Sequence, residues 1–281
     1  MLSYQHTYHA GNHADIVKHI VLQQIVLSMQ NKDTPMFMLD AFASRAIYDL
    51  TSPEAQKNSE FKTGAELIWQ QLNCPSQPAP IRTFLQHLQS HNEHGKLDCY
   101  PGSSSVLLNH MREQDQLMAC DLHPQEFDAL SQLSYHNRQK VSVQRRDAYE
   151  ALKALLPPKQ KRGIVFLDPS YEDKSEYQRI AEAVIARYPH FRAGVYVIWY
   201  PLLPAGQHAE LLKLFKHSGI RKILRVELDT AQLESMQMHG SGLLIINPPW
   251  QAQSNIKLAL NWLQPVLAPQ GFTHFDWLVD E

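Results

Sequence analysis

The chain has 281 residues, of which 44% are hydrophobic and 19% are charged, a composition that fits a globular protein and excludes a disordered one. This length allows one large α/β domain, or one domain that carries an insertion. The formal net charge of −2 gives no sign of nucleic-acid binding, and no apolar run is long enough to cross a bilayer.

The first predicted element is a helix over residues 12–30. Asn12 can cap this helix and Asp15 lies in its first turn, where a carboxylate complements the helix dipole. An apolar stripe on the helix is formed by Ile16, Val17, Ile20 and Val21.

Seven short apolar segments predict buried strands. They cover residues 35–42, 116–122, 140–147, 163–171, 194–201, 222–228 and 241–249. Helical periodicity separates most of them, which indicates a mainly parallel, doubly wound α/β sheet. The stretch 229–240 contains no convincing helix, so we expect a hairpin there and an antiparallel last strand. This layout is typical of Rossmann-like class I methyltransferases that use S-adenosylmethionine.

Residues 50–98 interrupt the alternation of strands and helices. Two predicted helices, "KTGAELIWQQL" and "PIRTFLQHLQSH", flank the proline-rich "CPSQPAP". We interpret residues 50–98 as a small helical subdomain inserted after the first strand, and residues 1–49 with 99–281 as the methyltransferase core.

Charged and sulfur-containing side chains narrow the functional class only slightly. The basic residues form three clusters: Arg138, Lys140, Arg145 and Arg146; Lys153, Lys159, Lys161 and Arg162; and Lys213, Lys216, Arg221, Lys222 and Arg225. Such clusters can bind phosphates, although basic faces that simply contact solvent are more common.

We expect no metal site, because the histidines near the N-terminus lack HExxH-like or cysteine spacing. Three widely spaced cysteines and the absence of a signal-peptide pattern predict a cytoplasmic protein.

Four successive predicted strands end in an aspartate. These residues are Asp40, Asp121, Asp147 and Asp168. A single strand-end aspartate is commonly a helix cap, but the carboxyl ends of parallel strands line one ligand crevice. The order along the chain suits a division in which Asp121 binds ribose hydroxyls, Asp147 binds the adenine amine and Asp168 binds the substrate.

The stretch "DPSY" (168–171) matches the Asp/Asn-Pro-Pro-aromatic tetrad of amino-methyltransferases except for Ser170. The carboxylate of Asp168 and the carbonyl of Pro169 can accept hydrogen bonds from an exocyclic amine, which stabilises the positive charge that develops during methyl transfer. Tyr171 can stack on an extruded base. An ordinary surface turn is the alternative interpretation.

A second stretch, "NPPW" (247–250), satisfies the tetrad fully. It follows the last predicted strand, far in order from the strands expected to bind the cofactor. Proline pairs often simply end a strand. We therefore favour "DPSY" as the active tetrad.

The chain resembles a known family through motifs in constant order: "MLSYQHTYHAGNHADIVKH", "YPGS", "DLHP", "DPSYE", "VIWYP", "GIRKIL" and "INPPW". It is similar to the bacterial 23S rRNA adenine-N6 methyltransferase J family, formerly labelled a protein involved in catabolism of external DNA. The resemblance runs from residue 1 to about residue 278. It implies S-adenosylmethionine as the cofactor and an adenine of 23S rRNA, presented single-stranded or flipped, as the substrate.

The same resemblance implies roles for individual residues. Asp168 matches the catalytic acid of the family, and the tetrad adds Pro169 and Tyr171 to the predicted catalytic set. Tyr4 matches a residue implicated with the RNA substrate. Ser103, Asp121, Asp147 and His19, with Lys18 beside it, match cofactor contacts of the family. The predicted cofactor-binding set also includes Asp40 at the end of the first strand, and Phe42 and Ala148 at positions where the family has other residues. Lys18 or His19 is expected to hold the methionine carboxylate of the cofactor.

The chain departs from the family pattern around the cofactor. The turn "DAFASRA" (40–46) has Phe42 in place of a histidine, and Ser44 and Ala46 in place of glycines that allow close backbone approach. Ala148 likewise replaces a glycine, and Asp121 replaces a glutamate. We expect the side chains of Ser44 and Arg45 to crowd the methionine end of the pocket.

Two functional hypotheses remain. The first is an rRNA adenine-N6 methyltransferase that uses S-adenosylmethionine. The second is a catalytically degenerate family member that binds nucleic acid and is linked to the use of external DNA. A nicotinamide-dependent dehydrogenase is excluded on this pattern, because no GxGxxG follows the first strand.

Overall fold

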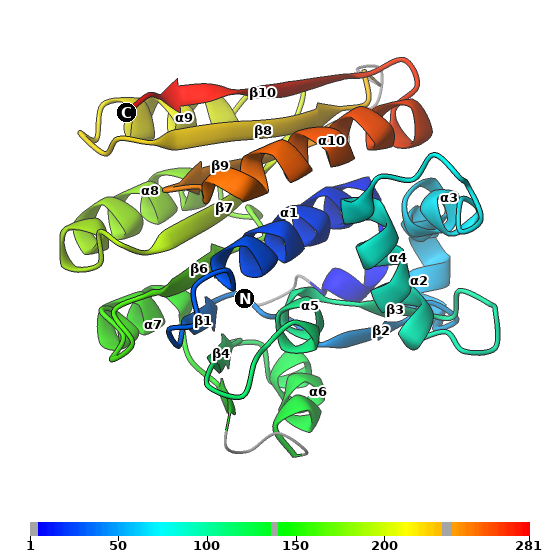
Figure 1. Ribbon diagram of the computed structural model, residues 1–281, viewed down its shortest axis with the longest axis horizontal. Coiled ribbons are helices and arrows are strands. Elements are labelled where there is room, and N and C mark those ends of the chain that lie inside the picture. The colour runs from blue at the N-terminus through cyan, green and yellow to red at the C-terminus, as the bar shows by residue number, and fades with distance from the viewer. Residues whose placement is uncertain (1–4, 136–139, 232–237) are drawn as a thin grey trace.

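A central sheet of eight strands, in the order β10-β8-β9-β7-β6-β1-β4-β5, organises the protein (Figure 1). The structure is a computed structural model, and it describes residues 5–135, 140–231 and 238–281. The strands are β1 (Phe37–Asp40), β4 (Gln116–Cys120), β5 (Val141–Gln144), β6 (Gly163–Leu167), β7 (Val195–Leu202), β8 (Ile223–Asp229), β9 (Gly240–Ile246) and β10 (Phe272–Val279).

Strand direction divides the sheet into two parts. Strands β7, β6, β1, β4 and β5 are parallel to one another. Strand β9 runs antiparallel to both β7 and β8, and β10 runs antiparallel to β8. Strands β6 and β7 are apolar throughout and fully buried, because helices cover both faces of the sheet at its centre.

The mainly parallel α/β sheet and the antiparallel hairpin of β8 and β9 are confirmed. The strand count is wrong, because β10 adds an eighth, antiparallel strand at the edge. Its sequence, "FTHFDWLV", mixes apolar and polar side chains, and several of these side chains are exposed. An edge strand of this kind lacks the continuous apolar run by which the other strands were recognised.

Helices form a layer on each face of the sheet (Figure 1). They are α1 (His13–Met29), α2 (Pro53–Asn58), α3 (Ala65–Trp69), α4 (Ala79–Ser90), α5 (Ser103–Asn109), α6 (Pro124–Tyr135), α7 (Ala148–Leu155), α8 (Glu176–Arg187), α9 (His208–Lys216) and α10 (Trp250–Leu267), with short 3-10 turns η1 (His6–Tyr8), η2 (Glu60–Thr63) and η3 (Tyr188–His190). Helix α1 packs against α10, α5 and α4 on one face, and α8 packs between α7 and α9 on the other.

Helix α1 begins where the sequence predicts. The side chain of Asn12 caps it by accepting the backbone N–H of Asp15 at 3.0 Å. The helix is more deeply buried than its apolar stripe suggested, because α10, α5, α4 and the sheet surround it. Lys18 and His19 are only 2% and 3% exposed. Their polar groups must therefore find partners inside the protein.

Residues between β1 and β4 include two short strands that the sequence did not reveal. Strand β2 (Ile47–Asp49) pairs antiparallel with β3 (Cys99–Pro101), and α2, η2, α3 and α4 lie between them in the chain. Helices α3 and α4 pack against α10. That residues 50–98 form an inserted subdomain stays a prediction.

Candidate active site

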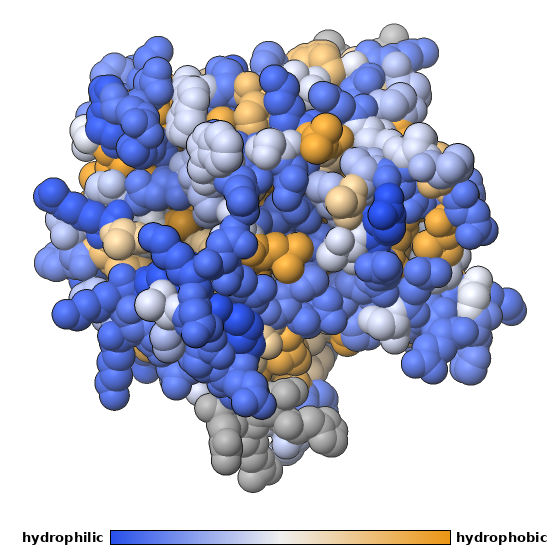
Figure 2. All heavy atoms as spheres, viewed as in Figure 1, coloured by the Kyte–Doolittle hydropathy of each residue, from blue (hydrophilic) through white to orange (hydrophobic). Residues whose placement is uncertain are grey.

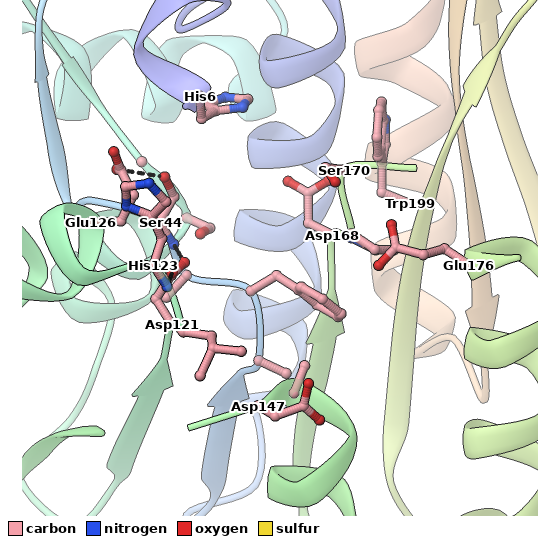
Figure 3. Close-up of a pocket in the computed structure, with 18 of the residues that line it drawn as sticks. His6, Ser44, Asp121, His123, Glu126, Asp147, Asp168, Ser170, Glu176 and Trp199 are labelled. Carbon is pink, nitrogen blue, oxygen red and sulfur yellow. Dashed lines mark hydrogen bonds between the residues drawn. The ribbon is translucent and has the colours of Figure 1, made fainter. Parts of the chain in front are cut away.

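A cavity of about 400 Å³ lies at the carboxyl ends of β1, β4, β5 and β6 (Figure 3). The residues on its wall that the sequence had singled out as cofactor or catalytic residues are His19, Phe42, Ser103, Asp121, Asp147, Ala148, Asp168 and Pro169. Open α/β sheets bind ligands at this edge because the turns that follow the strands meet there. The volume is within the range of ordinary small-molecule sites.

Three of the four strand-end aspartates, Asp121, Asp147 and Asp168, line this cavity, and Asp40 does not. Asp40 is fully buried, and its Oδ2 accepts hydrogen bonds from the hydroxyls of Ser103 and Ser104, each at 2.7 Å. Burial raises the pKa of Asp40 to about 7, although the two hydroxyls act in the opposite direction. Asp40 therefore joins the end of β1 to the start of α5, and the structure does not place it on the cavity wall.

Asp121 and Asp147 are each held by backbone amides. Asp121 accepts the N–H of His123 at 2.7 Å and that of Ser44 at 2.8 Å. Asp147 caps α7 by accepting two N–H groups of its first turn. Each carboxylate oxygen has a second lone pair, so both side chains can still accept hydrogen bonds from a ligand.

Asp168 forms an ion pair with Lys18 of α1. The ammonium Nζ of Lys18 lies 2.7 Å from Oδ2 of Asp168 and 3.0 Å from Oδ1 of Asp15. Burial raises the pKa of Asp168 above its ordinary value, and the ammonium opposes that shift. Burial by itself lowers the pKa of Lys18, but the carboxylates of Asp168 and Asp15 raise it above its ordinary value. The side chain of Lys18 therefore stays protonated. Lys18 is thus placed to hold Asp168.

The N-terminal turn extends this polar chain. Nε2 of His6 donates to the carboxylate of Asp15 at 2.9 Å, and the backbone N–H of Gly11 donates to it at 2.8 Å. Although burial favours its protonation, His6 and Lys18 hold the pKa of Asp15 well below the ordinary value. His6 itself lines the cavity (Figure 3). Sequence reasoning assigned neither His6 nor Asp15 to the site, although both belong to the N-terminal motif of the family.

His19 lines the cavity as a neutral side chain. Burial lowers its pKa to about 3, and its Nδ1 lies 2.8 Å from the hydroxyl of Tyr100. A neutral imidazole can hydrogen-bond to a carboxylate but adds no positive charge. Of the two side chains expected at the methionine carboxylate, Lys18 is thus turned to Asp168 and His19 is uncharged.

The aromatic side chain of the tetrad does not line the cavity. Tyr171 is 7% exposed, its hydroxyl donates to the backbone carbonyl of Trp199 at 2.6 Å, and its ring centroid lies 4.3 Å from that of Tyr177. Its backbone is left-handed, with φ 54°, which turns the side chain into the core. Trp199 lines the wall instead. The centroid of its ring lies 4.4 Å from the ammonium of Lys18. The "VIWYP" motif marked Trp199 without assigning it a role.

The divergent cofactor turn does not fill the pocket. The guanidinium of Arg45 turns away to form two hydrogen bonds with the carboxylate of Glu126, and Arg45 is not part of the wall. Ser44 and Phe42 do line the cavity, but Ser44 directs its hydroxyl to Glu126 at 2.9 Å. The expected crowding by Arg45 is therefore wrong. Sequence reasoning missed Glu126, which no motif marks.

The second tetrad match lies at the opposite edge of the sheet. Strand β9 is antiparallel, so its last residue, Ile246, pairs with Tyr196 near the start of β7. The side-chain amide of Asn247 donates to the backbone carbonyls of Arg192 and Gly194 at 2.8 and 2.9 Å. Asn247 therefore closes a turn and contributes nothing to the cavity, which agrees with the preference for "DPSY".

Other predicted residues are placed as follows. Tyr4 and Arg138 lie outside the described residues. Arg146 lines the cavity, and Arg145 donates to the backbone carbonyl of Leu122. In the part of the chain that the structure describes, no group of three or more His, Cys, Asp or Glu side chains is arranged to hold a metal ion.

The length and the apolar character of the helices bear on whether the chain could cross a membrane. Within the described ranges, no helix is both long enough and apolar enough to cross a bilayer. Figure 2 shows a mainly hydrophilic face in which apolar side chains form small, separate patches.

Comparison with known proteins places the chain in a family. Residues 33–279 match the family model described as "Ribosomal RNA large subunit methyltransferase D, RlmJ". Proteins named ribosomal RNA large subunit methyltransferase J are similar over the full length of both chains, with 36% identity in Escherichia coli K12 and 35% in Haemophilus influenzae. A crystal structure from Legionella pneumophila, 36% identical, superposes with a TM-score of 0.89 over 96% of this chain and 98% of its own. The chain therefore belongs to the ribosomal RNA large subunit methyltransferase RlmJ family.

Proposed function

We propose that the protein transfers a methyl group from S-adenosylmethionine to the N6 amine of an adenine in 23S rRNA. Its family and its relatives are ribosomal RNA methyltransferases, and the protein is an enzyme of that class. The observation that carries the proposal is the carboxylate of Asp168, held by Lys18 at the wall of the cavity, with Asp121 and Asp147 on the same wall.

The residues around the cavity fit the cofactor. Asp121 follows β4 and faces the cavity with lone pairs free for a ribose diol, and Asp147 follows β5 and can accept from the adenine amine. Ser103, at the start of α5, and His19 of α1 line the same cavity. The cofactor supplies a methyl group bonded to a sulfonium, which is electrophilic.

The protein must make the exocyclic amine, which is a weak nucleophile, reactive toward this methyl group. The lone pair of an exocyclic amine is delocalised into the purine ring, so its nitrogen attacks poorly. Among the described residues, Asp168 has a hydrogen-bond partner only at Oδ2, and the carbonyl of Pro169 has none. Oδ1 of Asp168 and this carbonyl are free to accept the two amine protons. Such bonds strengthen as positive charge grows on the nitrogen.

Lys18 gives Asp168 its orientation and its charge state. The ammonium fixes Oδ2, which leaves Oδ1 to face the cavity, and it opposes the effect of burial on the carboxyl group. His6 and Asp15 in turn hold Lys18 in place. The site therefore works through hydrogen bonding and electrostatics. The proton that the methylated amine loses passes to solvent, and Asp168 need not act as a strong base.

The substrate must present a base that has left its stack. The carboxylate of Asp168 is 15% exposed, at the wall of a cavity and not on a flat surface. An adenine within a helix cannot reach such a position, so a flipped or looped-out adenine is required.

The three free cysteines fit a reducing compartment, and we place the reaction in the cytoplasm.

A transfer assay tests the proposal. Unmodified 23S rRNA and labelled S-adenosylmethionine are incubated with the protein, and the product is mapped by nuclease digestion and mass spectrometry. We expect one N6-methyladenine per molecule of 23S rRNA, formed about 10²–10³-fold more slowly with Asp168→Ala. A catalytically degenerate protein would bind rRNA without forming product and would release no heat when titrated with S-adenosylhomocysteine.

A further inference from the structure

The turn after β1 is fastened to helix α6 by one buried carboxylate. Glu126 lies in the first turn of α6 and is 2% exposed. Its Oε2 accepts the hydroxyl of Ser44 and Nε of Arg45, both at 2.9 Å, and its Oε1 accepts the second guanidinium nitrogen at 2.7 Å. A planar guanidinium paired in this two-pronged way fixes direction as well as distance.

The same turn holds the carboxylate of Asp121. The backbone N–H of Ser44 donates to Oδ2 of Asp121 at 2.8 Å, and Ser44 adopts a left-handed conformation with φ 49°. A non-glycine residue seldom adopts this conformation unless its surroundings impose it. The contacts of Glu126 with Ser44 and Arg45 provide that constraint. Figure 3 shows Glu126, Ser44 and Asp121 together on one side of the cavity, opposite Asp168.

Packing supports the turn from two further directions. Ala43 and Ala46 form a small apolar cluster with Ala119 of β4 and Leu130 of α6. On the other side, the N–H of Gly102 donates to the carbonyl of Ala46 at 2.8 Å. A Cβ atom on Gly102 would come within 2.7 Å of the carbonyl oxygen of Arg45, so only glycine allows this approach.

We propose that Glu126 is a positioning residue for the methyl donor. It fixes the turn 41–46 through Ser44 and Arg45, and through Ser44 it aims the carboxylate of Asp121 at the ribose of S-adenosylmethionine. In this chain a hydrogen-bonded clamp thus shapes the wall of the cofactor pocket. The inference rests on the proposed function, since it names the residue that sets cofactor affinity at the same site.

The test compares Glu126→Gln with Asp128→Asn, which removes the same charge from an exposed position of the same helix. Affinity for S-adenosylhomocysteine is measured by calorimetry on the ligand-free protein, and KM and kcat are measured by methyl transfer. We expect Glu126→Gln to raise Kd and the KM for S-adenosylmethionine by about tenfold, the effect of losing one charged hydrogen bond. We expect kcat to stay within about twofold, because uniform binding is lost and not transition-state stabilisation. Asp128→Asn leaves all three unchanged.

Two smaller changes guard against a variant that does not fold. Ser44→Ala removes only the hydroxyl contact, and Arg45→Lys keeps the charge but loses the two-pronged geometry. Each is expected to raise Kd by about threefold. A Kd equal to that of the wild type in these variants overturns the proposal, as does a fall in kcat at constant Kd in Glu126→Gln. If the wild type itself binds no S-adenosylhomocysteine, the proposed function falls together with this inference.

Discussion

The chain contains two tetrad-like motifs, "DPSY" at 168–171 and "NPPW" at 247–250, and they lie at opposite edges of the sheet. The first follows parallel strand β6 and lies at the carboxyl edge, where the cavity is. The second follows antiparallel strand β9 and lies at the other edge. Both contain a left-handed residue, but it is the last residue of the first motif, Tyr171, and the first of the second, Asn247. The chain therefore bends after the acid in one motif and at the amide in the other.

The comparison teaches that letters alone do not define this site. "NPPW" matches the amino-methyltransferase pattern better, yet the amide of Asn247 is used up by two backbone carbonyls. Among the residues that the structure describes, Lys18 bonds only Oδ2 of Asp168, and Oδ1 has no hydrogen-bond partner. Strand direction decides which motif meets the cofactor pocket, and the buried ammonium decides which atom is available.

The largest expected difference between the motifs is in catalysis. Asp168→Ala removes the acceptor that faces the amine, and we expect kcat to fall by about 10²–10³-fold. Asn247→Ala should leave kcat within about twofold, because its side chain lies at the far edge. Single-turnover methyl transfer to 23S rRNA measures both. An equal loss of activity in the two variants would contradict the assignment of "DPSY" as the active tetrad.

Lys18→Met sharpens the comparison by removing what distinguishes Asp168. The carboxylate then loses the charge that opposes burial, so the pKa of Asp168 rises further above its ordinary value. Activity that needs the carboxylate is consequently lost at a higher pH than in the wild type. We expect kcat to fall by about 10–100-fold at neutral pH.

The pH profile separates this effect from a simple packing defect. In Lys18→Met the acid limb of kcat should move to higher pH, since removing a neighbouring positive charge favours the protonated carboxyl group. The matched control is Lys257→Met, which removes the same charge from helix α10, far along the chain from Asp168. A loss of activity with an unmoved acid limb would show that Lys18 does not act through Asp168.

Asn247→Ala is expected to change stability where Asp168→Ala changes catalysis. The variant loses two hydrogen bonds to the carbonyls of Arg192 and Gly194 and keeps a left-handed backbone that alanine disfavours. We expect a loss of about 1–3 kcal/mol in the free energy of unfolding. Asn247→Gly, which tolerates φ 56°, should lose less. Urea titration measures both, and a larger loss in the glycine variant would refute the role of backbone strain.

Most of the fold could be predicted from the sequence because its signals are local. Runs such as "GIVFL" and "VYVIWYPL" are apolar along their whole length, which is how a strand buried on both faces must look. The cap of α1 could be predicted for the same reason, since Asn12 bonds three residues ahead. Strand β10 could not, because an edge strand with one exposed side needs no apolar run. Strands β2 and β3 are three residues each and depend on their mutual pairing.

The site was predictable only in part. Strand-end position and motif led to Asp121, Asp147 and Asp168, which do line the cavity. The contacts of Lys18 with Asp168 and of Ser44 with Glu126 join residues 150 and 82 positions apart, and no local pattern encodes them. The direction of the Tyr171 ring depends on one backbone angle. Pairings and backbone angles of this kind require the folded chain.

Substitutions of the aromatic residues that end the two motifs, Tyr171 and Trp250, should show the smallest difference in the free energy of unfolding. Tyr171 is buried and bonds the carbonyl of Trp199, whereas Trp250 is 83% exposed at the start of α10. Tyr171→Phe should cost about 1 kcal/mol in the free energy of unfolding, because one buried hydrogen bond is lost and the ring packing is kept. Trp250→Ala should stay within about 0.5 kcal/mol, as expected for an exposed side chain. Thermal and urea unfolding measure both variants.

Because the Tyr171 ring is off the cavity wall, kcat of Tyr171→Phe should remain within about threefold of the wild type. A much larger fall in kcat at unchanged stability would mean that the hydroxyl of Tyr171 acts on the substrate, and that the ring leaves the core when RNA binds.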